Sequence, residues 1–241
     1  MRARITGRRR RRKLVLAVAF AVVALLATGV ALGLADDVID LVRGKPAPKD
    51  VQKLSFRSYK PPPGAGWDQP QADASRARGV SAVRVDGGLF GLWEAPVRGG
   101  GWCFATWVVD EDVRQLLAPG GTGACNRKPP PAGQLLPFEG LGWTGYFTDR
   151  ERAHWAGSVF GVSRSDVATV KVTFAGGLSR RARTLPSFYF SGVRYFLVAA
   201  PCGAEAERAE GLDRAGRVVA RGPKEAFFGG GAIDLPGQTC P

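Results

Sequence analysis

The chain has 241 residues, a formal net charge of +13, and 45% hydrophobic and 10% aromatic side chains. This hydrophobic content excludes a disordered chain, and 33 glycines and 17 prolines favour short strands and turns over long helices. The charge does not indicate nucleic-acid binding, because residues 1–13 carry +8 of it and residues 44–241 only +7. We therefore expect no nucleic-acid partner.

The first expected element is a transmembrane helix over Leu14–Ala35, 22 residues without a charged side chain. At about 1.5 Å per residue it reaches about 33 Å, enough to cross the hydrocarbon core of a bilayer. The basic segment 1–13 precedes it and three aspartates follow it, which predicts a cytoplasmic N-terminus and an extracytoplasmic C-terminal domain in a single-pass membrane protein. The alternative is a cleaved export signal ending in Gly33-Leu34-Ala35, and in either case the chain leaves the cytoplasm.

Residues 36–79 are rich in proline and predict an extended, semi-rigid stalk that lifts the following domain off the bilayer. Three aromatic residues in this segment, Phe56, Tyr59 and Trp67, are candidates to dock the stalk onto the domain. The domain itself is expected over residues 80–241.

From residue 80 the sequence changes to short alternating segments separated by glycine turns, the pattern of half-buried antiparallel strands. A helix of one or two turns is expected after Asp110, and a long irregular segment over 118–141. The fold class is therefore mainly β, a sandwich-like ectodomain or two small β units meeting near residue 163. The expected strands are 80–85, 89–97, 102–109, 142–148, 155–162, 167–174, 178–185, 188–190, 193–200, 205–213 and 217–221.

All four cysteines, Cys103, Cys125, Cys202 and Cys240, lie on the exported side of the predicted span. We expect disulfides, since no C-x-x-C pair exists and the chain has a single histidine, which argues against a metal site. Of the three possible pairings we favour Cys103 with Cys125 and Cys202 with Cys240, because these close the shortest loops. The expected bridge from Cys103 would hold the irregular segment in place.

No arrangement of residues in the sequence indicates a catalytic site. His154 is the single candidate for a histidine base, but its nearest serine, Ser158, is not in a G-x-S-x-G motif. The acidic group Asp110, Glu111 and Asp112 is explained by the start of the expected helix. We therefore assign no catalytic, metal or cofactor residue and expect no cofactor.

One group of basic and aromatic residues could contact an anionic polymer, because such side chains interleaved on a sheet bind anions and stack on rings. The alternative is an ordinary solvated strand face above a buried aromatic one. The candidate contact residues are Arg180, Arg181, Arg183, Arg194 and Tyr195, with Phe188, Tyr189 and Phe190 close by in the sequence.

The chain combines the arginine run, the single span, the proline-rich segment and the β-rich domain, with segments such as VATVKVTF (167–174) and AGRVV (215–219). In these features the chain resembles the membrane-anchored extracytoplasmic β-rich proteins of high-GC actinobacteria. Members of that group are mostly uncharacterised, so the resemblance implies a location and a fold but no site residue. We expect a structural or interaction module at the outer face of the membrane, with the lipid bilayer and an envelope polymer or another envelope protein as partners. The alternatives are an anchored or secreted hydrolase with an unrecognised site, and a binder of anionic envelope polymers.

Overall fold

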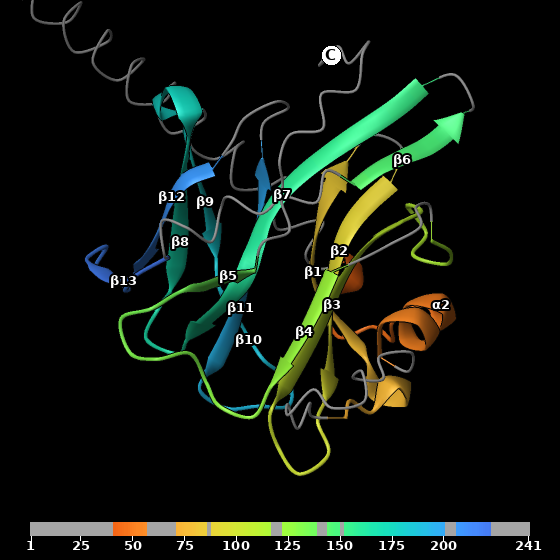
Figure 1. Ribbon diagram of the computed structural model, residues 1–241, viewed down its shortest axis with the longest axis horizontal. Coiled ribbons are helices and arrows are strands. Elements are labelled where there is room, and N and C mark those ends of the chain that lie inside the picture. Colours follow the sequence, from red (N-terminus) through yellow and green to blue (C-terminus); the bar gives the residue numbers. More distant parts are fainter. Residues whose placement is uncertain are drawn as a thin grey trace, which may run out of the picture. The chain divides into compact units, whose positions relative to one another are not determined.

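The structure, a computed structural model, describes residues 41–56, 71–85, 88–116, 122–138, 144–149, 152–200 and 206–222 (Figure 1). These residues are mainly β and form three antiparallel sheets, which confirms the expected fold class in its main feature. The predicted span Leu14–Ala35 lies outside the described residues. Within the described ranges, no helix is long and apolar enough to cross a membrane.

The first sheet has the strand order β1-β2-β3-β4. It contains the expected hairpin of residues 80–97 and the expected strand 102–109, so both of these predictions are confirmed. Every residue of the central strands β2 and β3 is buried except Pro96, which means that both faces of this sheet are covered. The strands are β1 (Arg78–Val85), β2 (Gly88–Pro96), β3 (Trp102–Val109) and β4 (Thr122–Asn126).

The middle sheet has the order β10-β11-β7-β5, and β6 pairs with the other end of β7. Its longest strand, β7, pairs with β11 through Ser163 and Arg194, so sheet pairing continues across the sub-boundary suggested near residue 163. The strands are β5 (Leu136–Phe138), β6 (Thr144–Asp149), β7 (Arg152–Arg164), β10 (Leu185–Pro186) and β11 (Val193–Ala200).

The third sheet has the order β13-β12-β8-β9. In β8, buried residues alternate with half-buried ones, as the sequence VATVKVTF predicts. The 3-10 turn η3 (Ala175–Gly177) joins β8 to β9, and Gly176 adopts a φ of 79°, a conformation that favours glycine. The strands are β8 (Thr169–Phe174), β9 (Ser179–Arg183), β12 (Ala206–Leu212) and β13 (Val218–Arg221).

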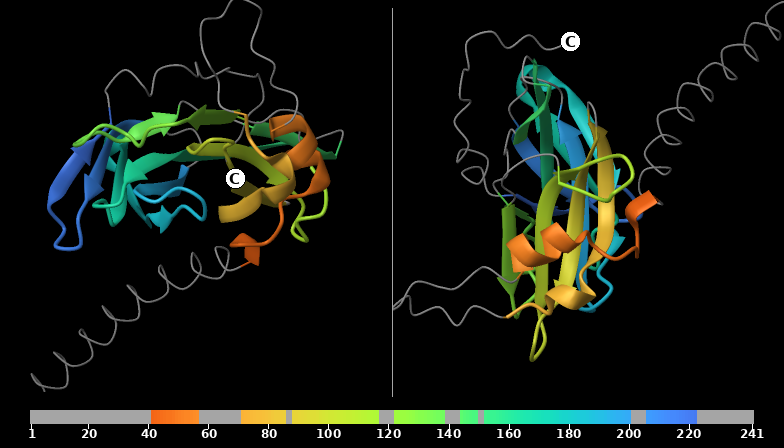
Figure 2. Two further views of the ribbon diagram at one scale, coloured as in Figure 1. Left: turned by 90° about the horizontal axis from the view of Figure 1, so that it is seen from below. Right: turned by 90° about the vertical axis from the view of Figure 1, so that its right-hand side faces the viewer.

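The middle sheet takes part in two hydrophobic cores because its side chains alternate between its two faces. Phe160 and Tyr195 belong to a core shared with the first sheet, whereas Val159 and Phe196 belong to a core shared with the third sheet. The domain is therefore built in three layers, with the middle sheet between the other two (Figures 1 and 2). The first core contains Val80, Phe90, Leu92, Trp102, Phe104, Val108, Phe160, Val162, Leu185, Val193, Tyr195 and Leu197.

Residues 41–47 run along the edge of β1 and are part of the domain. The Gly44 N–H donates to the Gly79 carbonyl (2.9 Å), and the Gly79 N–H donates to the Lys45 carbonyl (2.9 Å). A Cβ atom at position 79 would lie 2.2 Å from the Val42 carbonyl oxygen, so this close approach requires glycine.

Short helical segments follow beside the first sheet (Figure 2). They are α2 (Lys49–Val51), η1 (Gln52–Phe56) and η2 (Ala74–Arg76), and Val42, Ala47, Val51 and Ala77 are buried. The stalk predicted over residues 36–79 is therefore wrong for 41–56 and 71–79, since apolar side chains between the prolines pack onto the domain. Residues 57–70, which include Tyr59 and Trp67, lie outside the described residues.

Three local predictions after residue 110 are also wrong. Asp110 does cap the backbone, accepting the N–H groups of Arg114 (2.6 Å) and Gln115 (3.1 Å), but it caps a turn and not a helix, and Val113 has a φ of 59°. The segment 118–141 is not irregular throughout, because β4 and β5 lie within it. Residues 188–190 form the loop between β10 and β11 and not a strand.

Candidate functional site

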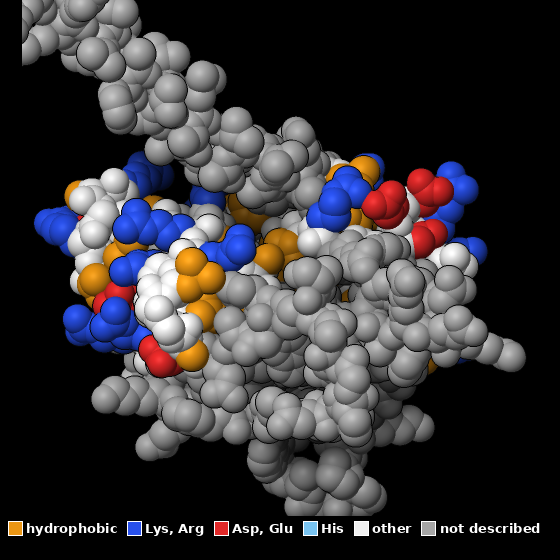
Figure 3. Space-filling view, turned by 90° about the horizontal axis from the view of Figure 1, so that it is seen from above, with side chains coloured by type: hydrophobic (Ala, Val, Ile, Leu, Met, Phe, Trp, Pro, Cys, Tyr) orange, Lys and Arg blue, Asp and Glu red, His pale blue; other side chains and the backbone are white. Residues whose placement is uncertain are grey.

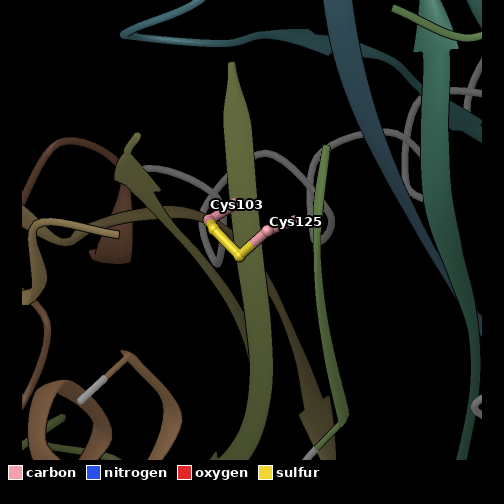
Figure 4. Close-up of a disulfide and its surroundings, with 2 residues drawn as sticks. All are labelled: Cys103 and Cys125. Carbon is pink, nitrogen blue, oxygen red and sulfur yellow. A yellow bond between two sulfur atoms is a disulfide. The ribbon is translucent and has the colours of Figure 1, made fainter. Parts of the chain in front are cut away.

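A disulfide joins the first pair of cysteines, as predicted. Cys103 on β3 and Cys125 on β4 lie directly opposite each other, with their Cα atoms 4.1 Å apart (Figure 4). The bridge fixes β4 at the edge of the first sheet. Cys202 and Cys240 lie outside the described residues, so their pairing stays a prediction.

The three neighbouring arginines of the predicted polyanion group lie on β9, an edge strand of the third sheet. Because successive side chains of a strand point to opposite faces, this strand divides them. Arg181 and Arg183 stand opposite Lys171 and Thr169 of β8, on the solvent-facing side of the sheet, whereas Arg180 stands opposite the buried Val172. The sequence analysis treated the three as one set, which the sheet register does not support.

The solvent-facing side of the third sheet carries a row of charged residues across all four strands. Arg181 pairs with Lys171, Lys171 with Glu210, and Glu210 with Arg221. Arg208 lies on the same side, and its Nε is 3.8 Å from Glu210 Oε2. Figure 3 shows lysine and arginine side chains gathered on the side where the third sheet lies (left). We call this surface the basic face, and its charged residues are Lys171, Arg181, Arg183, Arg208, Glu210 and Arg221.

The remaining two predicted contact residues lie on β11, in different surroundings. The Arg194 guanidinium donates from Nε to Thr184 Oγ1 (2.6 Å) and from Nη2 to the Thr184 carbonyl (2.7 Å), which makes it a structural residue between β10 and β11. Partial burial lowers its pKa, and the nearby Arg214, Arg43 and Arg183 add to this effect. The Tyr195 side chain is 1% exposed and packs edge-on against Phe104 in the first core, so we leave it out of the surface.

A buried carboxyl group lies between the first and middle sheets. Glu94 on β2 is 1% exposed, and its Oε1 accepts the backbone N–H of Phe188. Burial raises the pKa of Glu94 to about 7, although the Phe188 N–H, the Ser187 and Tyr195 hydroxyls and Arg43 each oppose this rise. Glu94 Oε2 and the Tyr195 hydroxyl have no well-formed hydrogen bond in the described part of the chain, although the two groups are close enough to affect each other's pKa.

Arginine and aromatic side chains from three separate segments meet beside this carboxyl. The Arg43 guanidinium lies over the Phe188 ring at 4.8 Å from its centroid, and the Arg76 guanidinium lies over the Tyr189 ring at 5.3 Å. Arg78 donates from Nε to the Tyr189 hydroxyl (3.1 Å). We call these five residues the arginine–aromatic cluster. The sequence analysis missed it because it placed all three arginines in the stalk, and no local pattern predicts which turn they pack against.

The residues considered for catalysis do not come together in the described part of the chain. Glu111 pairs with Arg84 and Asp110 caps its turn, so these two acidic residues have structural roles. Ser158 is fully buried, and His154 lies on β7 opposite Tyr146, with its side chain outside the described atoms. No group of three or more potential metal ligands occurs in the described ranges.

Comparisons of the chain with protein-family models, with curated proteins and with solved structures found no match. A function for this chain therefore has to be argued from its own surfaces.

Proposed function

We propose that the protein is a membrane-anchored extracytoplasmic interaction module that binds an anionic polymer of the cell envelope through the basic face. The anchoring part of the proposal rests on the apolar length of Leu14–Ala35 and the basic residues before it. The disulfide between Cys103 and Cys125 supports an oxidising compartment, because disulfides persist mainly outside the cytosol.

The observation that carries the polymer-binding part is the cross-strand row Arg181–Lys171–Glu210–Arg221. Neighbouring strands lie about 4.8 Å apart, so the register places four charged groups at short intervals across the sheet, three of them cationic. The basic face carries five cationic side chains; its carboxylate Glu210 is close to Arg208, and Glu207, which is exposed at the bulge of β12, is next to Arg208 in the chain. An extended polyanion could therefore meet several cations at once along this surface.

Binding of this kind depends on charge and is weakened by salt, since exposed charges interact over a Debye length of about 8 Å at physiological ionic strength. Arg181 and Arg180 provide a matched pair of variants: they are adjacent on β9, both are exposed, and they stand on opposite faces of the sheet. Arg181→Gln and Arg180→Gln remove the same charge from the same strand.

The test uses the full chain in mild detergent on purified cell wall and, as a defined polyanion, on immobilised dextran sulfate. Arg181→Gln and the double variant Lys171→Gln/Arg181→Gln are expected to elute at lower salt than the wild type. Arg180→Gln is expected to elute close to the wild type. Equal losses in Arg180→Gln and Arg181→Gln would show that only net charge matters and would reject the basic face as the binding surface.

A further inference from the structure

The folded domain begins a short distance along the chain from the predicted span. Val42 is 1% exposed, and Arg43 is already bridged to Gly79 of β1. From Ala35 to residue 41 the chain has six peptide steps, which reach about 20 Å when fully extended. If the chain is anchored as proposed above, the surface around Arg43 is held within that distance of the bilayer, which a stalk ending at residue 79 would not require.

The surface around Arg43 has the chemistry of a membrane interface. Lys45, Arg76 and Arg78 are exposed, and the Phe188 side chain is 41% exposed beside them. Three described acidic groups belong to or contact the segments that carry these side chains: Asp73, which caps η2 by accepting the Ser75 N–H and hydroxyl and is close enough to Arg76 to be affected by its charge; the buried Glu94, affected by Arg43; and the exposed Asp50, five residues after Lys45. Positively charged side chains next to an exposed aromatic ring are favoured where a protein meets lipid headgroups.

The contacts within the arginine–aromatic cluster hold its cationic and aromatic side chains in a fixed arrangement. Arg43 donates to the carbonyls of Val80 and Pro186 (both 3.3 Å), which joins β1 to β10 just before the loop that carries Phe188. The Tyr189 hydroxyl donates to the Arg76 carbonyl and accepts from Arg78. A Cβ atom at position 44 would lie 3.8 Å from Phe188 Cζ, so residues 41–47 lie beside this loop. The arginine side chains of the cluster are thus already ordered before binding, so they lose little conformational entropy when they bind.

We propose that the arginine–aromatic cluster, together with Lys45, docks onto anionic phospholipid headgroups of the outer leaflet, from which the predicted span emerges. Arg76, Arg78 and Lys45 would contact phosphate groups, and Phe188 would enter the interface between headgroups and acyl chains. The proposal rests on the anchoring part of the proposed function and does not depend on polymer binding by the basic face. It gives the domain a fixed orientation, with one surface facing the bilayer.

The test measures the accessibility of two lysines in the full chain, reconstituted in vesicles of phosphatidylcholine with or without phosphatidylglycerol. A membrane-impermeant N-hydroxysuccinimide ester labels exposed lysines, and mass spectrometry gives the labelling rate at each position. The exposed Lys45 reports on the cluster, and the half-buried Lys171 on the basic face serves as the control, with each lysine compared with its own labelling rate in phosphatidylcholine alone. Phosphatidylglycerol is expected to slow labelling of Lys45 and to leave labelling of Lys171 unchanged.

Two substitutions at the margin of the cluster test whether these side chains contact the lipid. Arg76→Gln removes a cation and keeps the bond from the Tyr189 hydroxyl to the backbone, whereas Phe188→Ser removes the exposed ring and keeps the backbone N–H bonded to Glu94. Arg76→Gln is expected to reduce the lipid-dependent protection of Lys45 about fivefold, since one cation near an anionic surface contributes about 1 kcal/mol. Unchanged near-ultraviolet circular dichroism shows that each variant is folded, and Lys171→Gln/Arg181→Gln is expected to keep full protection of Lys45.

The possible failures are distinguishable. If alkaline carbonate extracts the chain from the vesicles, both the anchoring and the docking are rejected. If the chain stays anchored but phosphatidylglycerol leaves Lys45 labelling unchanged, or protects Lys171 equally, the docking surface alone is rejected. If Lys45 is protected while the basic-face variants bind polymer like the wild type, the polymer-binding proposal alone is rejected.

Discussion

The backbone N–H of Phe188 donates a hydrogen bond to the carboxylate of Glu94, a residue 94 positions earlier in the chain. This bond joins the loop between β10 and β11 to the centre of the first sheet. It also places an ionisable group among apolar side chains, where the charged form is poorly solvated. The loop that carries Phe188 and Tyr189 is therefore coupled to the protonation state of Glu94.

We expect Glu94 to make the protein less stable as the pH rises. Its pKa is raised from the ordinary value near 4.5 to about 7 by burial, so between these values the folded state binds more protons than the unfolded state. The contribution of the protonated carboxyl to the unfolding free energy is fully present below pH 4.5 and is lost as the pH rises through 7. The loss amounts to about 3 kcal/mol of unfolding free energy, from about 1.4 kcal/mol per pKa unit.

Glu94→Gln stays neutral and can still accept the Phe188 N–H, so it is expected to match the wild type near pH 4.5 and to exceed its stability at pH 8. Guanidinium unfolding of the full chain in detergent, followed by tryptophan fluorescence, gives both free energies. Glu111→Gln, on the surface beside Arg84, is the control and should follow the wild type. A difference between Glu94→Gln and the wild type that does not change with pH would contradict the prediction.

Thr184 is expected to be a sensitive position because its buried hydroxyl both donates and accepts hydrogen bonds. Oγ1 donates to the Val167 carbonyl (2.6 Å) and accepts from Arg194 Nε (2.6 Å). Thr184→Val keeps the shape and leaves both partners unsatisfied, at a cost of about 1 to 3 kcal/mol. Thr184→Ser keeps the hydroxyl and should lose less, so a shift of the denaturant midpoint in the serine variant as large as in the valine variant would count against this role.

Removal of the Cys103–Cys125 disulfide is expected to lower the unfolding free energy by about 3 kcal/mol, since it closes a loop with a sequence separation of 22. The variant Cys103→Ala/Cys125→Ala should unfold at lower denaturant than the oxidised wild type. Added reductant should shift the wild type further than the variant, in which only the predicted Cys202–Cys240 bridge is left to reduce. Non-reducing peptide mapping of the same sample shows whether Cys202 and Cys240 are bonded to each other, as predicted.

Gly79→Ala is expected to release residues 41–47 from the edge of β1, because the added Cβ would overlap the Val42 carbonyl oxygen. Trypsin should then cleave faster after Arg43 and Lys49; Lys45 is followed by Pro46 and is not a trypsin site. Cleavage after Arg214 and Arg217, in the turn between β12 and β13, provides the internal control and should not change. If cleavage after Arg43 is as slow as in the wild type, the close packing of this segment is not needed to hold it.

The sequence predicted the elements whose signals are local. The strand VATVKVTF alternates over its whole length, and the disulfide could be chosen from loop length among three pairings. Asp110 shows the limit of local signals, because its carboxylate caps a turn as readily as a helix and Val113 then leaves the helical region. The capping was predicted correctly and the element was not.

The candidate surfaces depend on register and on packing between sheets, which no local pattern carries. Arg180 and Arg181 are neighbours in the sequence, yet pairing with β8 places them on opposite faces. Arg43 and Phe188 are far apart in the sequence, and their contact follows only once residues 41–47 are aligned along β1. Prolines around Val42 and Ala47 suggested an extended segment, but the chain turns at Gly44, where the Lys45 N–H bonds to the Val42 carbonyl, and the segment is bonded to the sheet.

The segment 41–47 has one further consequence, because β1 is the edge strand of the first sheet. An uncovered edge strand presents free backbone donors and acceptors to other chains and favours intermolecular strand pairing. Here the Gly44 and Ala47 N–H groups donate to the carbonyls of Gly79 and Ala77. Pro46, in the covering segment, has no N–H group that could pair with another chain. Proteolytic shedding before residue 41 would free a domain with this edge still protected, whereas a cut within 41–47 would free a domain prone to self-association.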